Sequence, residues 1–203
     1  MSGAQPLNFV LSLAPEEVAR ANFYGLLARL FYAPPDAALL ETLAGAEGID
    51  AQDGGIGAAW EALREAAAQT DPETVRQEYD DAFVGTGKAP VTLYTTAYSI
   101  RYASETPLAK LRGDLAALGL ARRADAGEPE DHIAALCDVM RHLIAVQKRE
   151  LAQQAAFFKR WIAPAAGPLC DAAAADPSTS FYKAVARFAK AFLDIEQSAF
   201  EML

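Results

Sequence analysis

Residues 128–132, with the sequence EPEDH, hold the side chains best suited to ionic or proton-transfer chemistry. The Asp131 carboxylate can bind an arginine through two parallel hydrogen bonds, and the His132 imidazole can bind a peptide carbonyl. The functional interpretation places both side chains on a groove that binds a peptide. The structural interpretation is that Pro129 and its acidic neighbours form the first turn of a helix. Each acidic charge there stabilises the helix by about 0.3–1 kcal/mol through the helix dipole. Local pattern alone favours the second interpretation, and both can hold together.

An aromatic cluster in and beside one loop is the second candidate for binding. Its members are Tyr79, Phe83, Tyr94, Tyr98 and Tyr102. Such rings combine a large apolar area with a polar tip, which suits recognition of an apolar peptide segment. Helical spacing assigns Phe83 to the core. Tyr94 and Tyr98 lie outside strong periodicity and are predicted to make exposed contacts.

Signals for other chemistry are weak. The stretch from Gly85 to Lys88 lacks the spacing of a phosphate-binding loop, and no GxSxG sequence occurs. His132 and His142 are ten residues apart, which places them about 80° apart around a helix, so they predict no metal site. We expect neither metal nor cofactor. Two alternatives to peptide binding stay open: a small hydrolase that uses Asp131 and His132 for proton transfer, and a structural subunit whose partner covers an apolar helix face.

Bulk composition limits the class of protein. The 203 residues, 52% of them hydrophobic, predict one domain over residues 1–203. A net charge of −9 disfavours nucleic acid and anionic membranes, and it favours a cationic partner or simple solubility. No uncharged apolar run reaches the length of a membrane span, and residues 1–13 contain no Lys or Arg. Cys137 and Cys170 are predicted to be free thiols, which indicates a reducing, cytoplasmic location.

Helical periodicity dominates the chain and predicts an all-α bundle. The predicted starts of its main helices are Pro15, Asp36, Asp71 with Pro72, Thr106 with Pro107, Pro129, and Asp176 with Pro177. A further alanine-rich helix holds Trp60, and residues 86–104 are interpreted as an ordered loop with a short helix. The helix that follows Pro129 is predicted to run past Leu151 toward Trp161, where Pro164 and Pro168 interrupt it.

Two motifs resemble the TorD/DmsD/NarJ family of redox-enzyme maturation chaperones. Residues 78–85 (EYDDAFVG), Pro90 and residues 94–98 (YTTAY) are similar to the family pattern E-Y-x-x-L-F-x-G followed by a proline-containing loop with P-Y-E-S-x-Y. The positions that match in this first motif are Glu78, Tyr79, Phe83, Gly85, Tyr94 and Tyr98. Leu93, Thr95 and Thr96 replace its proline, acidic residue and serine. Residues 128–133 (EPEDHI) match the family's E-P-x-D-H-[IL] fully.

The resemblance extends to the first and last helices and so covers nearly the whole chain. It implies a TorD/DmsD-like helical bundle that acts in the cytoplasm, without enzymatic activity. It also implies partners: the twin-arginine leader peptide and the apo-form of a molybdenum-containing oxidoreductase, held until its cofactor is inserted. A monomer and a helix-swapped homodimer are both compatible with it. The predicted peptide-binding residues are Tyr79, Phe83, Gly85, Pro90, Tyr94, Tyr98, Glu128, Pro129, Asp131 and His132.

Overall fold

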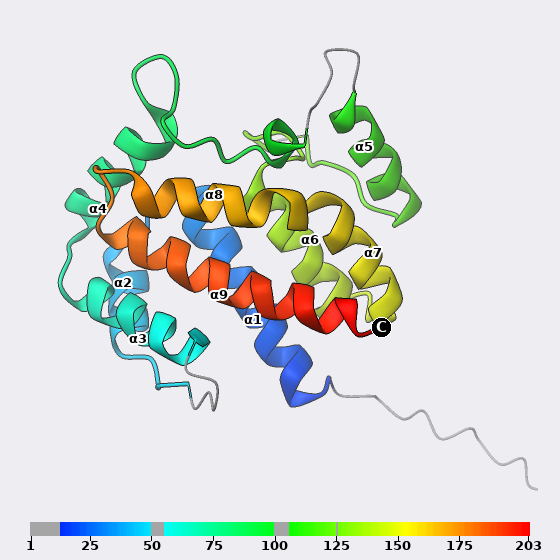
Figure 1. The fold of residues 1–203 in the computed structure, drawn as a ribbon, viewed down its shortest axis with the longest axis horizontal. Helices are drawn as coiled ribbons and strands as arrows, with labels where there is room; N and C mark the ends of the chain where they lie inside the picture. The colour runs from blue at the N-terminus through cyan, green and yellow to red at the C-terminus, as the bar shows by residue number, and fades with distance from the viewer. Residues whose placement is uncertain (1–12, 50–54, 100–105, 125) are drawn as a thin grey trace, which may run out of the picture.

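The computed structural model describes residues 13–49, 55–99, 106–124 and 126–203, and within these ranges the fold is all-α (Figure 1). The elements are α1 (Pro15–Tyr32), α2 (Ala37–Ala44), α3 (Gly55–Ala68), α4 (Pro72–Tyr79), the π-turn η1 (Asp80–Val84), the 3₁₀ turn η2 (Thr95–Tyr98), α5 (Pro107–Ala117), α6 (Ile133–Ala145), α7 (Leu151–Trp161), α8 (Ala163–Ala175) and α9 (Phe181–Glu201). The predicted fold class is confirmed.

The bundle is organised around two long helices, α1 and α9. α1 packs along α6, whereas α9 packs against α8 on one side and α3 on the other (Figure 1). Their apolar faces supply much of the core, including Tyr24, Leu27, Tyr182 and Phe188, which are fully buried. Within the described ranges, no helix combines the length and apolar composition needed to cross a bilayer.

Several helix starts lie where the sequence predicts them. The Asp36 carboxylate accepts a hydrogen bond from the Leu39 amide at 2.9 Å. The Asp71 carboxylate accepts from the Glu73 and Thr74 amides at 3.0 and 3.1 Å. These side chains satisfy amides that have no partner within the helix, which is why Asp is effective at this position.

The prediction of one helix from Pro129 toward Trp161 is wrong in two respects: the helix starts later, and the segment forms two helices. α6 begins only at Ile133 and ends at Ala145, and the separate helix α7 begins at Leu151. Lys148, between them, has a backbone φ of 48°. A residue in this left-handed region cannot continue a right-handed helix, so the chain turns there.

The last two helices also differ from the predicted pattern. Pro164 lies in the first turn of α8 and Pro168 lies inside that helix, so Pro168 does not interrupt it. α9 begins at Phe181, four residues after Pro177. Cys137 and Cys170 are free thiols, as predicted. Both are buried, and burial raises the pKa of each thiol.

Candidate functional site

The two motifs meet through a short backbone pairing. An isolated antiparallel bridge joins Tyr94 to His132. The Thr95 amide donates to the Asp131 carbonyl at 2.9 Å, and the Ile133 amide donates to the Leu93 carbonyl at 2.8 Å. Segments more than thirty residues apart in the chain are thereby held in direct contact. We call this contact, formed by residues 93–96 and 131–133, the motif joint.

Asp131 lies inside the motif joint. Its side chain is 5% exposed, and its carboxylate accepts a short hydrogen bond from the Thr96 hydroxyl. The neighbouring Thr95 hydroxyl donates to the Asp131 carbonyl at 3.2 Å. The two threonines that depart from the family pattern are therefore the residues that hold Asp131. The functional interpretation of the sequence placed Asp131 on a groove. In the structure, its carboxylate and its carbonyl bind threonines of the other segment and so connect the two segments.

His132 is the N-cap residue of α6. Its Nδ1 accepts a hydrogen bond from the Ala134 amide at 3.2 Å, and its side chain is 4% exposed. Burial lowers the pKa of the imidazole, so the neutral ring is favoured, with Nδ1 as acceptor. The hydrogen bonds of Asp131 and His132 thus go to Thr96 and to a helix amide. That arrangement does not favour a proton-transfer pair.

The burial of His132 predicts a pH-dependent stability. Because its native pKa lies below the value of about 6.5 for a free histidine, only the unfolded chain gains the proton as pH first falls below 6.5. We expect the free energy of unfolding to decrease there, by at most about 1.4 kcal/mol per pH unit for one proton. The variant His132→Asn keeps a capping acceptor without the titration. Urea unfolding at pH 7.5 and 5.5 should show a smaller decrease for this variant, and an equal decrease would contradict the assignment.

Tyr79 and Phe83 belong to the core. The Tyr79 hydroxyl donates to the carbonyls of Phe31 and Tyr32 at 3.0 and 3.1 Å, which satisfies the last turn of α1. Phe83 packs edge-on against Tyr182, with ring centroids 5.0 Å apart. Burial raises the pKa of Tyr79 to about 12. The core assignment of Phe83 is confirmed, and Tyr79 shares it.

Gly85 and Pro90 shape the loop after η1. Gly85 has a φ of 64°, and a Cβ atom at this position would come within 2.9 Å of the Lys88 carbonyl oxygen. Only glycine fits both requirements. Pro90 is exposed on the same loop, beside the exposed side chain of Val84. Tyr102, the fifth predicted aromatic residue, lies outside the described residues.

Glu78, a matching residue outside the predicted binding set, has a structural role that sequence reasoning missed. Its buried carboxylate accepts hydrogen bonds from the amides of Ser180, Phe181 and Tyr182 at 2.9, 3.1 and 3.1 Å. These are the unpaired amides at the start of α9. Glu78 therefore caps α9 from α4, across more than 100 residues of sequence. A Glu at that position carries no local signal for such a contact.

Tyr94, which is exposed, and Glu128, which is half-buried, form the outer part of the site. The Tyr94 side chain is 38% exposed, and its hydroxyl donates to the Glu128 carboxylate at 2.7 Å. This hydrogen bond raises the pKa of Tyr94 to about 12. The Tyr94 ring also packs edge-on against His132 at 5.6 Å. The predicted exposure of Tyr94 is confirmed. Tyr98 is half-buried and donates to the Thr92 carbonyl at 2.9 Å.

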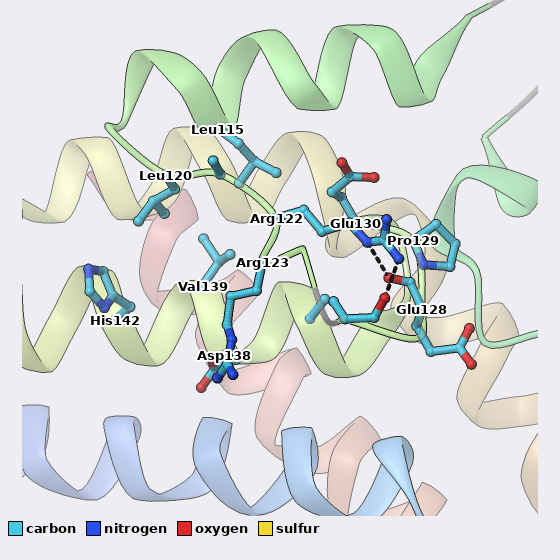
Figure 2. Close-up of a pocket in the computed structure, with 13 residues that line it drawn as sticks. Leu115, Leu120, Arg122, Arg123, Glu128, Pro129, Glu130, Asp138, Val139 and His142 are labelled. Carbon is cyan, nitrogen blue, oxygen red and sulfur yellow. Dashed lines mark hydrogen bonds between the residues drawn. The ribbon is translucent and has the colours of Figure 1, made fainter.

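A pocket lies beside this surface, between α5, the connector that precedes α6, and α6 itself (Figure 2). Leu115, Leu120 and Val139 give it an apolar side. Arg122 crosses it and donates to the carbonyls of Glu128, at 2.9 Å, and Ala126. This arginine thereby fixes the backbone that carries Glu128 and Pro129.

The acidic side of the pocket is partly neutralised. Arg112 binds both carboxylate oxygens of Glu130, at 2.9 and 3.1 Å, and lowers the pKa of Glu130. Figure 2 shows Arg123 extending toward Asp138, while Glu128 points to the outer edge. Among the residues that the structure describes, no three His, Cys, Asp or Glu side chains are grouped to hold a metal ion.

Comparisons with known proteins give one family and one fold. Residues 49–171, which include both motifs, match the family model described as the nitrate reductase delta subunit. The fold is similar to a crystal structure described as a redox enzyme maturation protein from Archaeoglobus fulgidus, with a TM-score of 0.58 and 17% sequence identity. That alignment covers 93% of this chain and 99% of the other. No curated protein sequence matches the chain at a significant level.

Proposed function

Because the chain belongs to the nitrate reductase delta subunit family, which confirms the resemblance to the TorD/DmsD/NarJ chaperones, we propose that it matures a molybdenum-containing oxidoreductase. In this proposal the protein binds the twin-arginine leader and the apo-form of its client. It supports folding and cofactor insertion in the cytoplasm before export. No chemical step on a substrate is involved.

The proposed leader site is the surface formed by Tyr94, Glu128 and the adjoining pocket. The observation that carries it is the Tyr94–Glu128 contact, a half-exposed aromatic ring and a carboxylate side by side at the motif joint. A carboxylate can bind an arginine of the leader in bidentate geometry. The apolar side of the pocket then offers room for the apolar residues that follow the two arginines.

The buried motif residues support this surface rather than touching the peptide. The Asp131 carboxylate connects the two segments of the motif joint through Thr96, the His132 imidazole caps α6, and Arg122 holds the backbone of Glu128. Micromolar affinity requires only about 8 kcal/mol, which a few well-placed anchors can supply. The net charge of −9 adds a general attraction for a cationic leader.

Titration calorimetry with a synthetic twin-arginine leader tests the proposal. We expect Glu128→Gln and Tyr94→Ala each to weaken binding by about tenfold, since each removes one polar or aromatic anchor. The matched control is Glu47→Gln, an exposed carboxylate between α2 and α3. Raising the salt concentration should weaken binding to the natural protein more than binding to Glu128→Gln.

A second peptide tests whether the surface recognises the guanidinium groups of the leader or only their charge. Replacing both leader arginines by lysine keeps the charge but removes the planar, bidentate group, so binding to the natural protein should weaken. Glu128→Gln should discriminate less between the two peptides. If both site variants bind the leader as tightly as Glu47→Gln does, the leader does not occupy this surface.

A further inference from the structure

An apolar groove lies at the other end of the bundle, between the first turns of α1 and the last turns of α9. It is lined mainly by Phe23, Leu151, Phe192, Ile195, Ala199 and Leu203. Ile195 is 48% exposed, and Leu151 and Leu203 are also exposed. Val18 and Met202 add further exposed apolar side chains on the same two helix ends. Exposed apolar residues gathered in this way indicate a surface that another molecule covers.

The charged residues that line the groove are mainly acidic, and the nearby Lys159 donates to the Phe200 carbonyl at 2.6 Å. The lining includes one cation, Arg20. Two nitrogens of the Arg20 guanidinium donate to the two carboxylate oxygens of Glu196, at 2.6 and 2.7 Å. The Arg20 guanidinium also lies over the Phe200 ring, 5.3 Å from its centroid. The charges left on the groove are those of Glu16 and Glu17, in the first turn of α1. A cationic partner is therefore favoured over an anionic one.

The groove is separated from the proposed leader site by the length of α1. Gly127, the residue before Glu128, lies beside Tyr32 at the end of α1, where a Cβ atom on Gly127 would be 4.0 Å from the Tyr32 hydroxyl, whereas Glu16 and Glu17 lie at the start of α1. At 1.5 Å per residue, these two ends of the helix are about 24 Å apart. The two surfaces can thus contact different parts of one partner.

We propose that this groove binds a basic amphipathic helix of the client protein, in a segment other than its leader. The apolar face of that helix would cover Ile195 and Leu151, and its basic flank would lie beside Glu16 and Glu17. The part of the lining that lies in α9 extends from Phe192 to Phe200, about 12 Å, which matches about two turns of a docked helix. That the partner is the client rests on the proposed function, whereas the chemistry of the groove does not.

The test uses the full chain and an 18-residue labelled peptide with leucine on one helical face and lysine on the other, followed by fluorescence anisotropy. Ile195→Asp should weaken binding at least tenfold, because it places a charge on the apolar floor. Glu16→Lys with Glu17→Lys should weaken binding by about tenfold at low salt. The control pair Glu41→Lys with Glu47→Lys changes the net charge equally on α2 and the loop after it and should have a much smaller effect. A peptide with glutamate in place of lysine should bind weakly.

The outcomes separate this inference from the proposed function. Ile195→Asp should still bind the twin-arginine leader, and the leader should not displace the leucine–lysine peptide. Displacement by the leader would overturn the assignment to a separate client segment. Equal effects of the two charge-reversal pairs would also overturn it, as would equal binding of the glutamate peptide. A dimer that Ile195→Asp dissociates would assign the groove to a second copy of the chain instead. Circular dichroism of each variant verifies that the fold is kept, and Ile195→Ala repeats the test if Ile195→Asp does not fold.

Discussion

We expect Glu78→Gln to lower the free energy of unfolding by about 2–4 kcal/mol. The Glu78 carboxylate accepts three hydrogen bonds from amides at the start of α9, and it is buried. Hydrogen bonds to a charged acceptor contribute about 1.5–3 kcal/mol each, and they are not additive when they share one group. Glutamine keeps the shape but offers one acceptor oxygen, and its amide nitrogen would face donors. Urea unfolding at neutral pH measures the loss.

Glu73→Gln is the matched control, on the same helix. Glu73 is exposed and pairs with Arg76 across one turn of α4, and such a surface pair contributes little to stability because water screens its charges. Hydrogen exchange localises the effect, since the amides of Ser180, Phe181 and Tyr182 should exchange faster in Glu78→Gln. If Glu78→Gln is no less stable than Glu73→Gln, the cap does not hold α9.

Local signals in the sequence located several of the helix starts, though not those of α6, α7 and α9. Asp36 and Asp71 cap their helices because an aspartate oxygen reaches the amide two or three residues ahead, a distance fixed by the chain itself. The start of α6 was misplaced because proline at the head of an acidic segment is also compatible with a turn. There the cap is His132, a residue with little preference for that position.

Local sequence signals could not predict the contacts between residues far apart in the chain. Nothing local to Glu78 indicates the start of α9, and nothing local to Thr96 indicates Asp131. The resemblance to the chaperone family identified these segments as important, but it could not separate residues that hold the fold from residues that touch a partner. The structure adds the burial of each side chain. Tyr94 is exposed and Glu128 is half-buried, whereas Asp131 and His132 are buried.

A second large effect is expected at Glu196, which joins α9 to α1. Its side chain is almost fully buried and binds Arg20 through both carboxylate oxygens, and it also accepts from the Tyr24 hydroxyl at 2.9 Å. We expect Glu196→Leu to lower the free energy of unfolding by about 3–5 kcal/mol, because it leaves a largely buried cation and a buried hydroxyl without their acceptor. Thermal and urea unfolding both report this change.

The cost of Glu196→Leu should arise from the groups left behind rather than from loss of the ion pair itself. Desolvation of two buried charges offsets much of their attraction, so a set of apolar residues of similar volume is often as stable as the pair. The triple variant Arg20→Met, Tyr24→Phe, Glu196→Leu removes all three polar groups together. We expect it to recover to within about 1 kcal/mol of the natural protein. Arg20→Met alone should remain destabilised, since it leaves the Glu196 carboxylate buried with Tyr24 as its partner. If the triple variant is as unstable as Glu196→Leu, the network stabilises the fold by its own attraction, and the account based on unpaired groups is wrong.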